Sequence, residues 1–128
     1  MKIRYTDAFD QKDCFLIFAF KGNTSLKIGE IRVCQGKDFY EFPSLHVKWI
    51  GVHVDYQRHK IGSHLYLLAA RESCKRGLPL QSGSTRSEQA QKFWEKQVRK
   101  KRATYNAEMF AYQLTCPPPK SLDGLRRR

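Results

Sequence analysis

The stretch VHVDYQRHKIGSHLYLLAARESCKRG, residues 52–77, contains the most informative pattern in the chain. β-Branched residues lead into a polar turn, and helical spacing of apolar residues begins near residue 60. The first N–H groups of a helix have no intrahelical partner, so a helix that starts just beyond a strand can bind phosphate. Arg58 and Lys60 add positive charge to the turn. This stretch therefore predicts a site for a phosphorylated ligand.

The segments before this stretch predict strands. KIRYT (2–6) is a short strand, CFLIFAF (14–20) a strand buried on both faces, and LKIGEIRVC (26–34) its hairpin partner. The alternation in the hairpin partner changes phase at Gly29, which predicts a β-bulge there. HVKWIGVHV (46–54) is rich in β-branched and aromatic residues and predicts the strand that leads into the helix.

The segments after the first helix predict a second helix and a final hairpin. Gly77 ends the first helix, and a short strand follows at residues 78–80. Thr85 and Glu88 have capping-box spacing, which predicts a helix capped by Thr85. Residues 102–114 predict the last hairpin. This order of elements indicates an α+β (mixed α/β) fold with helices packed on the faces of one sheet.

Length and composition indicate a small globular domain. The 128 residues suit one domain, which we place at 1–115, followed by a proline-rich basic tail at 116–128. No apolar run approaches the roughly 20 residues that span a bilayer, and the N-terminus lacks the apolar segment of a signal peptide. We therefore expect a cytoplasmic protein without a membrane partner.

Cysteine and histidine usage gives no sign of a metal site. The four cysteines are scattered without a CxxC pair, so we expect reduced thiols rather than a disulfide framework or a zinc site. His59 and His64 are five residues apart and do not share a helix face well. We therefore expect no bound metal.

The net charge of +12 predicts a polyanionic partner, although solubility alone would also explain it. The cations cluster in the segment 92–102 and at Arg126–Arg128. Such clusters suit nucleic acid or an acidic protein surface. No aromatic-interleaved RNA motif accompanies them.

Two motifs follow each other along the chain, QRHKIG at residues 57–62 and SEQAQKFWEK at residues 87–96. The first resembles the turn Gln/Arg-x-x-Gly-x-Gly/Ala of the GNAT superfamily of acyl-CoA N-acyltransferases. The second resembles the motif Asn-x-x-Ala-x-x-aromatic-aromatic-Glu-Lys of the same superfamily. The resemblance covers roughly residues 14–114 and implies a GNAT-like central mixed, mostly antiparallel sheet flanked by helices. It also implies an acetyl-CoA-dependent N-acetyltransferase, with acetyl-CoA as cosubstrate.

The resemblance implies a set of acetyl-CoA-binding positions in this chain. Backbone amides of the turn and helix start would hold the pyrophosphate, and Gly62 would let the backbone approach it closely. The backbone of Val52 and Val54 would pair with the pantetheine arm. The full set is Val52, His53, Val54, Gln57, Arg58, His59, Lys60, Ile61, Gly62, Ser63 and Ser87. Taken singly, Gly62, Ser87 and the turn cations also have ordinary interpretations, as packing, a first-turn residue and a solvated loop.

The chain departs from the family pattern in several respects. Lys60 replaces the first glycine of the turn, where we expect it to adopt an ordinary turn conformation. Trp94 stands where many members carry the tyrosine that protonates the CoA thiolate, and an indole cannot act as a general acid at neutral pH. The family's two N-terminal helices have no room between Thr6 and Cys14. Their absence predicts an open acceptor face, or one that a second subunit closes in a homodimer.

Several side chains near the expected cofactor strand are candidates for catalysis. Histidine titrates near neutral pH, so His46 and His53 are candidate general bases, with Glu30 as a third. Tyr105 or Tyr112 would replace the missing acid. The acceptor stays open among a small amine, a protein and an aminoacyl-tRNA. Two other functions stay open as well: a CoA-binding relative without catalysis, and a basic nucleic-acid-binding module.

Overall fold

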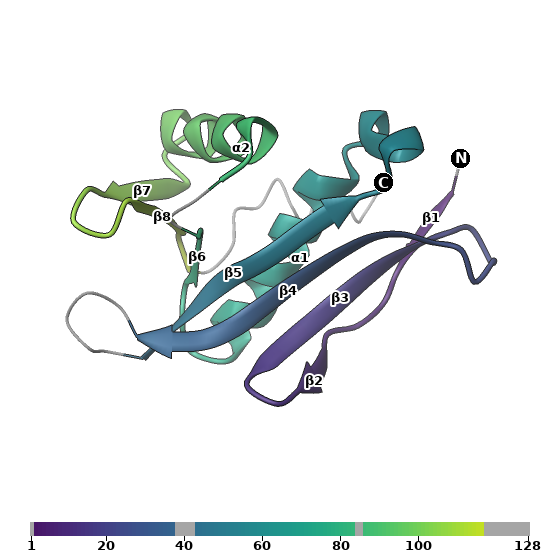
Figure 1. The fold of residues 1–128 in the computed structure, drawn as a ribbon. Coiled ribbons are helices and arrows are strands. Elements are labelled where there is room, and N and C mark those ends of the chain that lie inside the picture. Colours follow the sequence, from purple (N-terminus) through teal and green to yellow (C-terminus); the bar gives the residue numbers. More distant parts are fainter. Residues whose placement is uncertain (1, 38–42, 84–85, 117–128) are drawn as a thin grey trace.

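The strand-forming segments of the sequence assemble into one open, eight-stranded sheet (Figure 1). The computed structural model describes residues 2–37, 43–83 and 86–116. The strands are β1 (Ile3–Tyr5), β2 (Phe9–Gln11), β3 (Cys14–Lys21), β4 (Lys27–Lys37), β5 (Pro43–Val52), β6 (Leu80–Gln81), β7 (Ala103–Asn106) and β8 (Ala111–Leu114). The helices are η1, a 3₁₀ helix (Val54–His59), α1 (Ile61–Lys75) and α2 (Glu88–Arg99).

The sheet is mixed but mostly antiparallel, as predicted. Its order is β1-β3-β4-β5-β6-β8-β7, and β2 pairs with the other end of β3. Among the described strands only β5 and β6 run parallel, and they pair at Leu45–Leu80 and His46–Gln81. A parallel pair needs a crossover connection, which α1 supplies here. This arrangement confirms the predicted fold class, with one short strand, β2, that the sequence pattern did not reveal.

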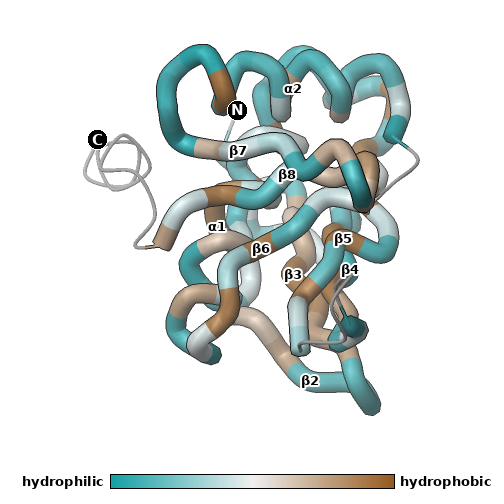
Figure 2. The backbone as a smooth tube through the Cα atoms, turned by 90° about the vertical axis from the view of Figure 1, so that its left-hand side faces the viewer, coloured by the Kyte–Doolittle hydropathy of each residue, from teal (hydrophilic) through white to brown (hydrophobic). Residues whose placement is uncertain are grey.

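The core lies between the sheet and α1. Ile61, Leu65 and Ala69 of α1 are completely buried. They belong to one apolar cluster with inward side chains of β3 and β4, such as Ile17 and Ile31. Each such aliphatic side chain contributes roughly 1.5–3 kcal/mol on burial. α2 packs beside α1 through aromatic contacts, and its backbone trace is mostly hydrophilic in colour because its outer side faces solvent (Figure 2).

A β-bulge in β4 lets α1 approach the sheet closely. The register changes from Ala19–Gly29 to Phe20–Lys27, so one residue of β4, Ile28, is extra. The bulge predicted at Gly29 is therefore confirmed at the adjoining residue. A Cβ on Gly29 would lie 3.0 Å from a side-chain carbon of α1, which explains the glycine.

Two element boundaries differ from the sequence prediction. The strand predicted at 46–54 is β5, which begins earlier and ends at Val52 because η1 starts at Val54. The cap of α2 is Ser87, whose hydroxyl accepts a hydrogen bond from the Ala90 N–H at 3.1 Å. Serine caps a helix at least as well as threonine. Because Ser87 is the cap, α2 starts at Glu88, two residues later than a Thr85 cap would place it. Thr85, the predicted cap, lies outside the described residues.

Both cysteine pairs form disulfides, which corrects the expectation of reduced thiols. Cys14 and Cys34 face each other across β3 and β4, with their Cα atoms 3.9 Å apart. Cys74, in the last turn of α1, is joined to Cys116, which follows β8. The expectation was wrong because spacing along the chain does not show which residues the strand pairing places side by side.

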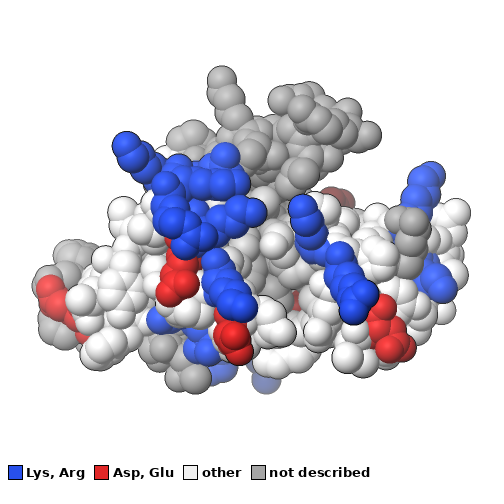
Figure 3. Space-filling view, turned by 90° about the horizontal axis from the view of Figure 1, so that it is seen from above, with Lys and Arg blue, Asp and Glu red and all other residues white. Residues whose placement is uncertain are grey.

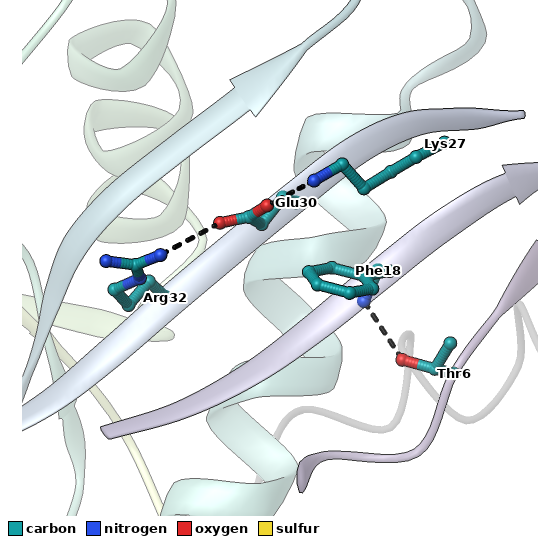
Figure 4. A network of polar contacts seen from close by, with 5 residues as sticks. All are labelled: Thr6, Phe18, Lys27, Glu30 and Arg32. Atoms are coloured by element: carbon teal, nitrogen blue, oxygen red, sulfur yellow. Dashed lines mark hydrogen bonds and ion pairs between the residues drawn. The ribbon is translucent and has the colours of Figure 1, made fainter. Parts of the chain in front are cut away.

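The face of β3 and β4 turned away from α1 carries no helix in the described part of the chain (Figure 1). On this face of β3 Leu16 is buried but Phe18 and Phe20 are only partly buried, so the expectation that β3 is buried on both faces holds only in part. Glu30 lies opposite Phe18 and forms ion pairs with Lys27 at 2.8 Å and Arg32 at 3.6 Å (Figure 4). Thr6 Oγ1 accepts from the Phe18 N–H at 3.0 Å and ties the N-terminal segment to β3. An uncovered face agrees with the expected lack of N-terminal helices.

Candidate functional site

Beyond its short pairing with β6, the outer edge of β5 pairs with no other strand in the described part of the chain. The His53 N–H donates to the Ile28 carbonyl at 2.8 Å, which fixes the phase of the β4–β5 ladder. Because antiparallel pairs alternate between bonded and non-bonded positions, Ile50 and Val52 direct their N–H and C=O groups away from β4. Of these groups, the Val52 carbonyl accepts from Gln57 Nε2 at 3.2 Å. This edge can pair with an extended ligand as another strand would.

The turn after β5 presents backbone donors at the start of α1. Lys60 is the N-cap of α1 and makes no side-chain cap hydrogen bond. Its φ of 57° and ψ of 26° are left-handed, so the expectation of an ordinary turn conformation is wrong. The left-handed conformation suits glycine, the family's usual residue at this position. The His64 N–H donates to the Lys60 carbonyl at 3.1 Å, whereas the N–H groups of residues 61–63 precede the helical ladder.

A cavity of about 480 Å³ opens between the β5 edge, the start of α1 and the start of α2. Cofactor and small-molecule sites typically measure about 300–1,000 Å³. Arg58 and Lys60 make one end positive, and Tyr66 and Phe93 provide an aromatic wall. The cavity therefore combines anion-binding groups with an apolar channel.

Gly62 lines this cavity, and the described part of the protein gives no structural reason for a glycine at this position. Its φ lies outside the left-handed region, and among the described residues a Cβ there would meet only Val52 Cγ2, at an ordinary 3.8 Å. Neither backbone conformation nor packing therefore requires glycine. A methyl group on this wall would hold a ligand away from the helix donors. The glycine fits the close approach of an anionic group.

Aromatic side chains of α1 and α2 build the inner wall. Tyr66 stacks on Phe93 with ring centroids 4.4 Å apart, and both meet Trp94 edge-on at 5.5 Å. Trp94 is completely buried and also stacks on Tyr112 of β8. Burial raises the pKa of Tyr66 to about 12, although Trp94 and Arg86 each act to lower it. The Tyr66 hydroxyl therefore keeps its proton across the neutral and mildly alkaline range.

Most of the predicted cofactor-binding residues meet at the cavity. Those that line it are Val52, Gln57, Arg58, Lys60, Gly62, Ser63 and Ser87. Of the others, His53 and His59 are exposed, Val54 is 73% exposed in η1, and the Ile61 side chain is buried in the core. The backbone edge expected at Val52 and Val54 falls instead at Ile50 and Val52, because β5 ends at Val52.

The sequence analysis missed part of the lining. The missed residues are Ile50, Gly51, Tyr66, Gln89, Ala90 and Phe93. Tyr66 reads as part of the apolar face of α1, yet it lies four residues after Gly62 and so on the same side of the helix. That spacing is the signal that could have found it.

The predicted histidine bases are not among the residues that line the cavity. His46 is four residues from Ile50, roughly 13 Å along a strand that rises about 3.3 Å per residue. Its Nε2 is hydrogen-bonded to the Ser44 hydroxyl. His53 Nδ1 accepts from the Asp55 N–H at 3.2 Å. In a neutral imidazole this leaves the proton on Nε2 and no free lone pair, so this arrangement does not favour His53 as a base.

The other catalytic candidates also lie outside the lining. Tyr105 is 45% exposed on β7, and its ring packs 4.8 Å from that of Tyr112. The Tyr112 hydroxyl accepts from Gln91 Nε2 at 2.8 Å. Glu30 is ion-paired on the uncovered sheet face. Their catalytic roles stay predictions.

Lysine and arginine side chains gather over α2 and the turn that follows it (Figure 3). We call Lys96, Lys100, Arg102 and Lys60 the basic surface. Repulsion by Lys96, the largest cause, lowers the pKa of Lys100, and Arg102 and Lys60 contribute to the same shift. Because Lys60 also lines the cavity, positive charge continues from the cavity mouth to the end of α2. A bound anion would relieve this repulsion.

Two searches of residues 2–37, 43–83 and 86–116 gave negative results. No helix in these ranges has both the length and the apolarity needed to cross a bilayer. The same ranges hold no group of three His, Cys, Asp or Glu side chains arranged to bind a metal ion.

Solved structures identify the fold of this chain. The crystal structure of AtaTR bound with AcCoA matches at a TM-score of 0.62 and 17% identity, over 90% of this chain and 73% of that one. The KacTA–DNA complex matches at 0.63 and 15% identity, over 92% and 76%. The chain has a GNAT-like fold.

Other acyltransferases share this GNAT-like fold. An acetyltransferase of Trypanosoma brucei matches at a TM-score of 0.55 and 17% identity, over 66% of this chain and 60% of that one. The cAMP-binding acyltransferase from Mycobacterium smegmatis matches at 0.56 and 20% identity, over 91% and 38%. The chain thus spans less than two thirds of either protein. No protein-family model matches it, and no curated protein aligns with it significantly. At identities this low, the structural matches establish the GNAT-like fold but not the activity.

Proposed function

We propose that this protein is an acyl-CoA-dependent N-acyltransferase that transfers the acetyl group of acetyl-CoA to a primary amine. One observation carries the proposal. In the described part of the chain, Gly62 and Ser63 at the start of α1 and residues 50–52 at the edge of β5 line one cavity of about 480 Å³. The AcCoA-bound structure with a similar fold supports the assignment.

The residues present fit a CoA thioester. The pyrophosphate would accept hydrogen bonds from the N–H groups of residues 61–63, with Arg58 and Lys60 adding charge. The glycine at position 62 leaves room for this contact. The pantetheine arm would lie along Ile50 and Val52, where backbone donors and acceptors face away from β4.

Acyl transfer would depend on a backbone N–H of β5 and on the positive charges at the cavity mouth more than on a titrating side chain. An N–H of the β5 edge would polarise the thioester carbonyl as the amine attacks. The cations at the cavity mouth disfavour a protonated amine nearby and so lower the pKa of the acceptor.

The basic surface favours an acceptor that carries negative charge. Lys60 and Lys100 link the cavity mouth to α2, so a polyanion bound along α2 would place its amine near the thioester. An aminoacyl-tRNA combines a phosphate backbone with a primary amine and fits this requirement better than a small cationic amine. An acceptor site could also use the uncovered sheet face, completed by a second subunit.

Calorimetry at low salt tests the proposal directly. Acetyl-CoA and free CoA should bind with micromolar affinity, and Arg58→Glu should weaken binding. Thiol release from acetyl-CoA in the presence of an amine panel and of aminoacyl-tRNA then tests transfer. Binding without release under any of these conditions would indicate a non-catalytic CoA-binding relative, an outcome that Trp94 favours. Salt-sensitive RNA or DNA binding with no response to acetyl-CoA would indicate a nucleic-acid-binding module instead.

A further inference from the structure

The aromatic wall of the cavity contains a hydroxyl that neither motif assigns. Tyr66 follows Gly62 by four residues, so it lies on the same face of α1, about 6 Å further along the helix axis. Gly62, Tyr66 and Phe93 all line the cavity. An extended ligand anchored at Gly62 and running inward would therefore reach Tyr66.

Trp94, which packs against Tyr66, carries an indole N–H donor that is important for the inference. Trp94 Nε1 is buried and, among the described residues, has no hydrogen-bond partner. The indole is close enough to lower the pKa of Tyr66, although its N–H is not aligned for a regular hydrogen bond. The indole N–H can only donate. It therefore faces the lone pairs of a phenol, whose own O–H stays available for a ligand.

We propose that the Tyr66 hydroxyl donates a hydrogen bond to the sulfur of CoA and stabilises the departing thiolate, the role that Trp94 cannot fill. This inference rests on the proposed function. As the amine attacks, the new C–N bond forms, the C–S bond breaks, and its electron pair passes to sulfur. The amine releases its proton to solvent, and the thiolate takes one from solvent, giving amide and thiol. Tyr66 keeps its own proton throughout.

The other tyrosines near the wall do not suit this role. The Tyr112 hydroxyl accepts from Gln91 Nε2, and Tyr112 does not line the cavity, so its O–H does not face the ligand space. Tyr105 lies on the exposed side of the β7–β8 hairpin. The raised pKa of Tyr66, about 12, also lies well above the ordinary thiol value of about 8.5. The phenol therefore acts as a hydrogen-bond donor and not as a source of the proton.

Titration of bound CoA tests the inference without knowledge of the acceptor. The probe is free CoA, whose thiolate is followed by ultraviolet absorbance in complexes with the wild-type protein, Tyr66→Phe and Tyr112→Phe. Tyr66→Phe should raise the thiol pKa by about 1–2 units, a 10- to 100-fold change in acid dissociation, because one hydrogen bond to a charged sulfur is lost. Tyr112→Phe removes a hydroxyl from the same aromatic cluster and should leave the thiol pKa unchanged. CoA affinity at neutral pH should be the same in all three proteins.

Turnover gives a second measurement. With any accepted amine, Tyr66→Phe should lower kcat about 10- to 100-fold and leave KM for acetyl-CoA nearly unchanged. Wild-type kcat should show no loss near pH 10, where an unperturbed tyrosine would ionise. An unchanged thiol pKa in Tyr66→Phe, with CoA still bound, would overturn the inference and leave the proposed function intact. Failure of the wild-type protein to bind CoA would overturn both.

Discussion

Gly62→Ala should stabilise the protein and weaken its binding of acetyl-CoA at the same time. Glycine is less favourable than alanine in a helix by up to about 1 kcal/mol, and the added methyl group meets only Val52 at 3.8 Å. A gain of 1 kcal/mol in a chain of 128 residues raises Tm by roughly 4 °C. The same methyl group stands between the helix donors and a phosphate. Loss of one charge-assisted hydrogen bond costs about 1.5–3 kcal/mol, which is roughly a 10- to 150-fold weaker Kd.

The assay pairs thermal unfolding of the free protein with calorimetry of acetyl-CoA at a fixed low salt concentration. Gly77→Ala is the matched control, since Gly77 follows α1, lies outside the cavity lining and has a φ of +88°. Alanine in this left-handed conformation should cost about 1 kcal/mol of stability and leave Kd unchanged.

Two results would refute the reasoning about Gly62. A Gly62→Ala protein that is less stable than wild type would show that the glycine serves packing or backbone conformation. A protein that is more stable and binds acetyl-CoA with unchanged affinity would show that the donors of residues 61–63 do not hold the phosphates.

Further predictions concern backbone strain, the first disulfide and pH. Lys60→Gly removes a left-handed lysine, so the free energy of unfolding should rise by up to about 1 kcal/mol in a denaturant titration, while the salt dependence of acetyl-CoA binding becomes shallower. Replacing Cys14 and Cys34 by serine should cost about 3 kcal/mol in the same titration, because the bridge closes a 20-residue separation. Burial, and then the charge of Lys60, lower the pKa of His64, so the unfolded state binds more protons and stability should fall as the pH drops below about 6.5. His64→Gln should flatten that dependence, and an unchanged slope would contradict it.

The elements could be predicted where local chemistry decides them. The helical spacing of α1, its stop at Gly77 and the phase change beside Gly29 each depend on a few neighbouring residues, and the structure confirms all of them. Features that depend on pairing between distant segments could not be predicted. The Cys14–Cys34 disulfide follows from the β3–β4 register, and β2 consists of three exposed residues without an apolar pattern.

The cavity could be predicted only in part for the same reason. The turn from Gln57 to Ser63 is local, and most of its residues line the cavity. The backbone edge at Ile50 depends on the phase of the β4–β5 ladder, which a single strand sequence does not contain. Tyr66 and Phe93 join the site only because α1 and α2 pack together, and an apolar helical face does not distinguish a core residue from the wall of a cavity.

Three local conflicts with stability lie at this site or directly beside it, and the one at Gly62 is evidence for function. Lys60 occupies a left-handed conformation that an L-residue avoids, and Gly62 stands in a helix that has room for alanine. Trp94 buries an indole N–H that has no partner within residues 2–37, 43–83 and 86–116. Each of these choices costs on the order of 1 kcal/mol or more in the free protein. Similar conflicts also occur outside the cavity lining, at the left-handed residues Lys12, Lys101 and Phe110, so a left-handed residue alone does not mark a site. Lys60 and Gly62 line the cavity, and Trp94 packs on Tyr66, which also lines it. At Gly62 neither packing among the described residues nor backbone conformation requires glycine, so the stability lost there is best explained by what the cavity binds.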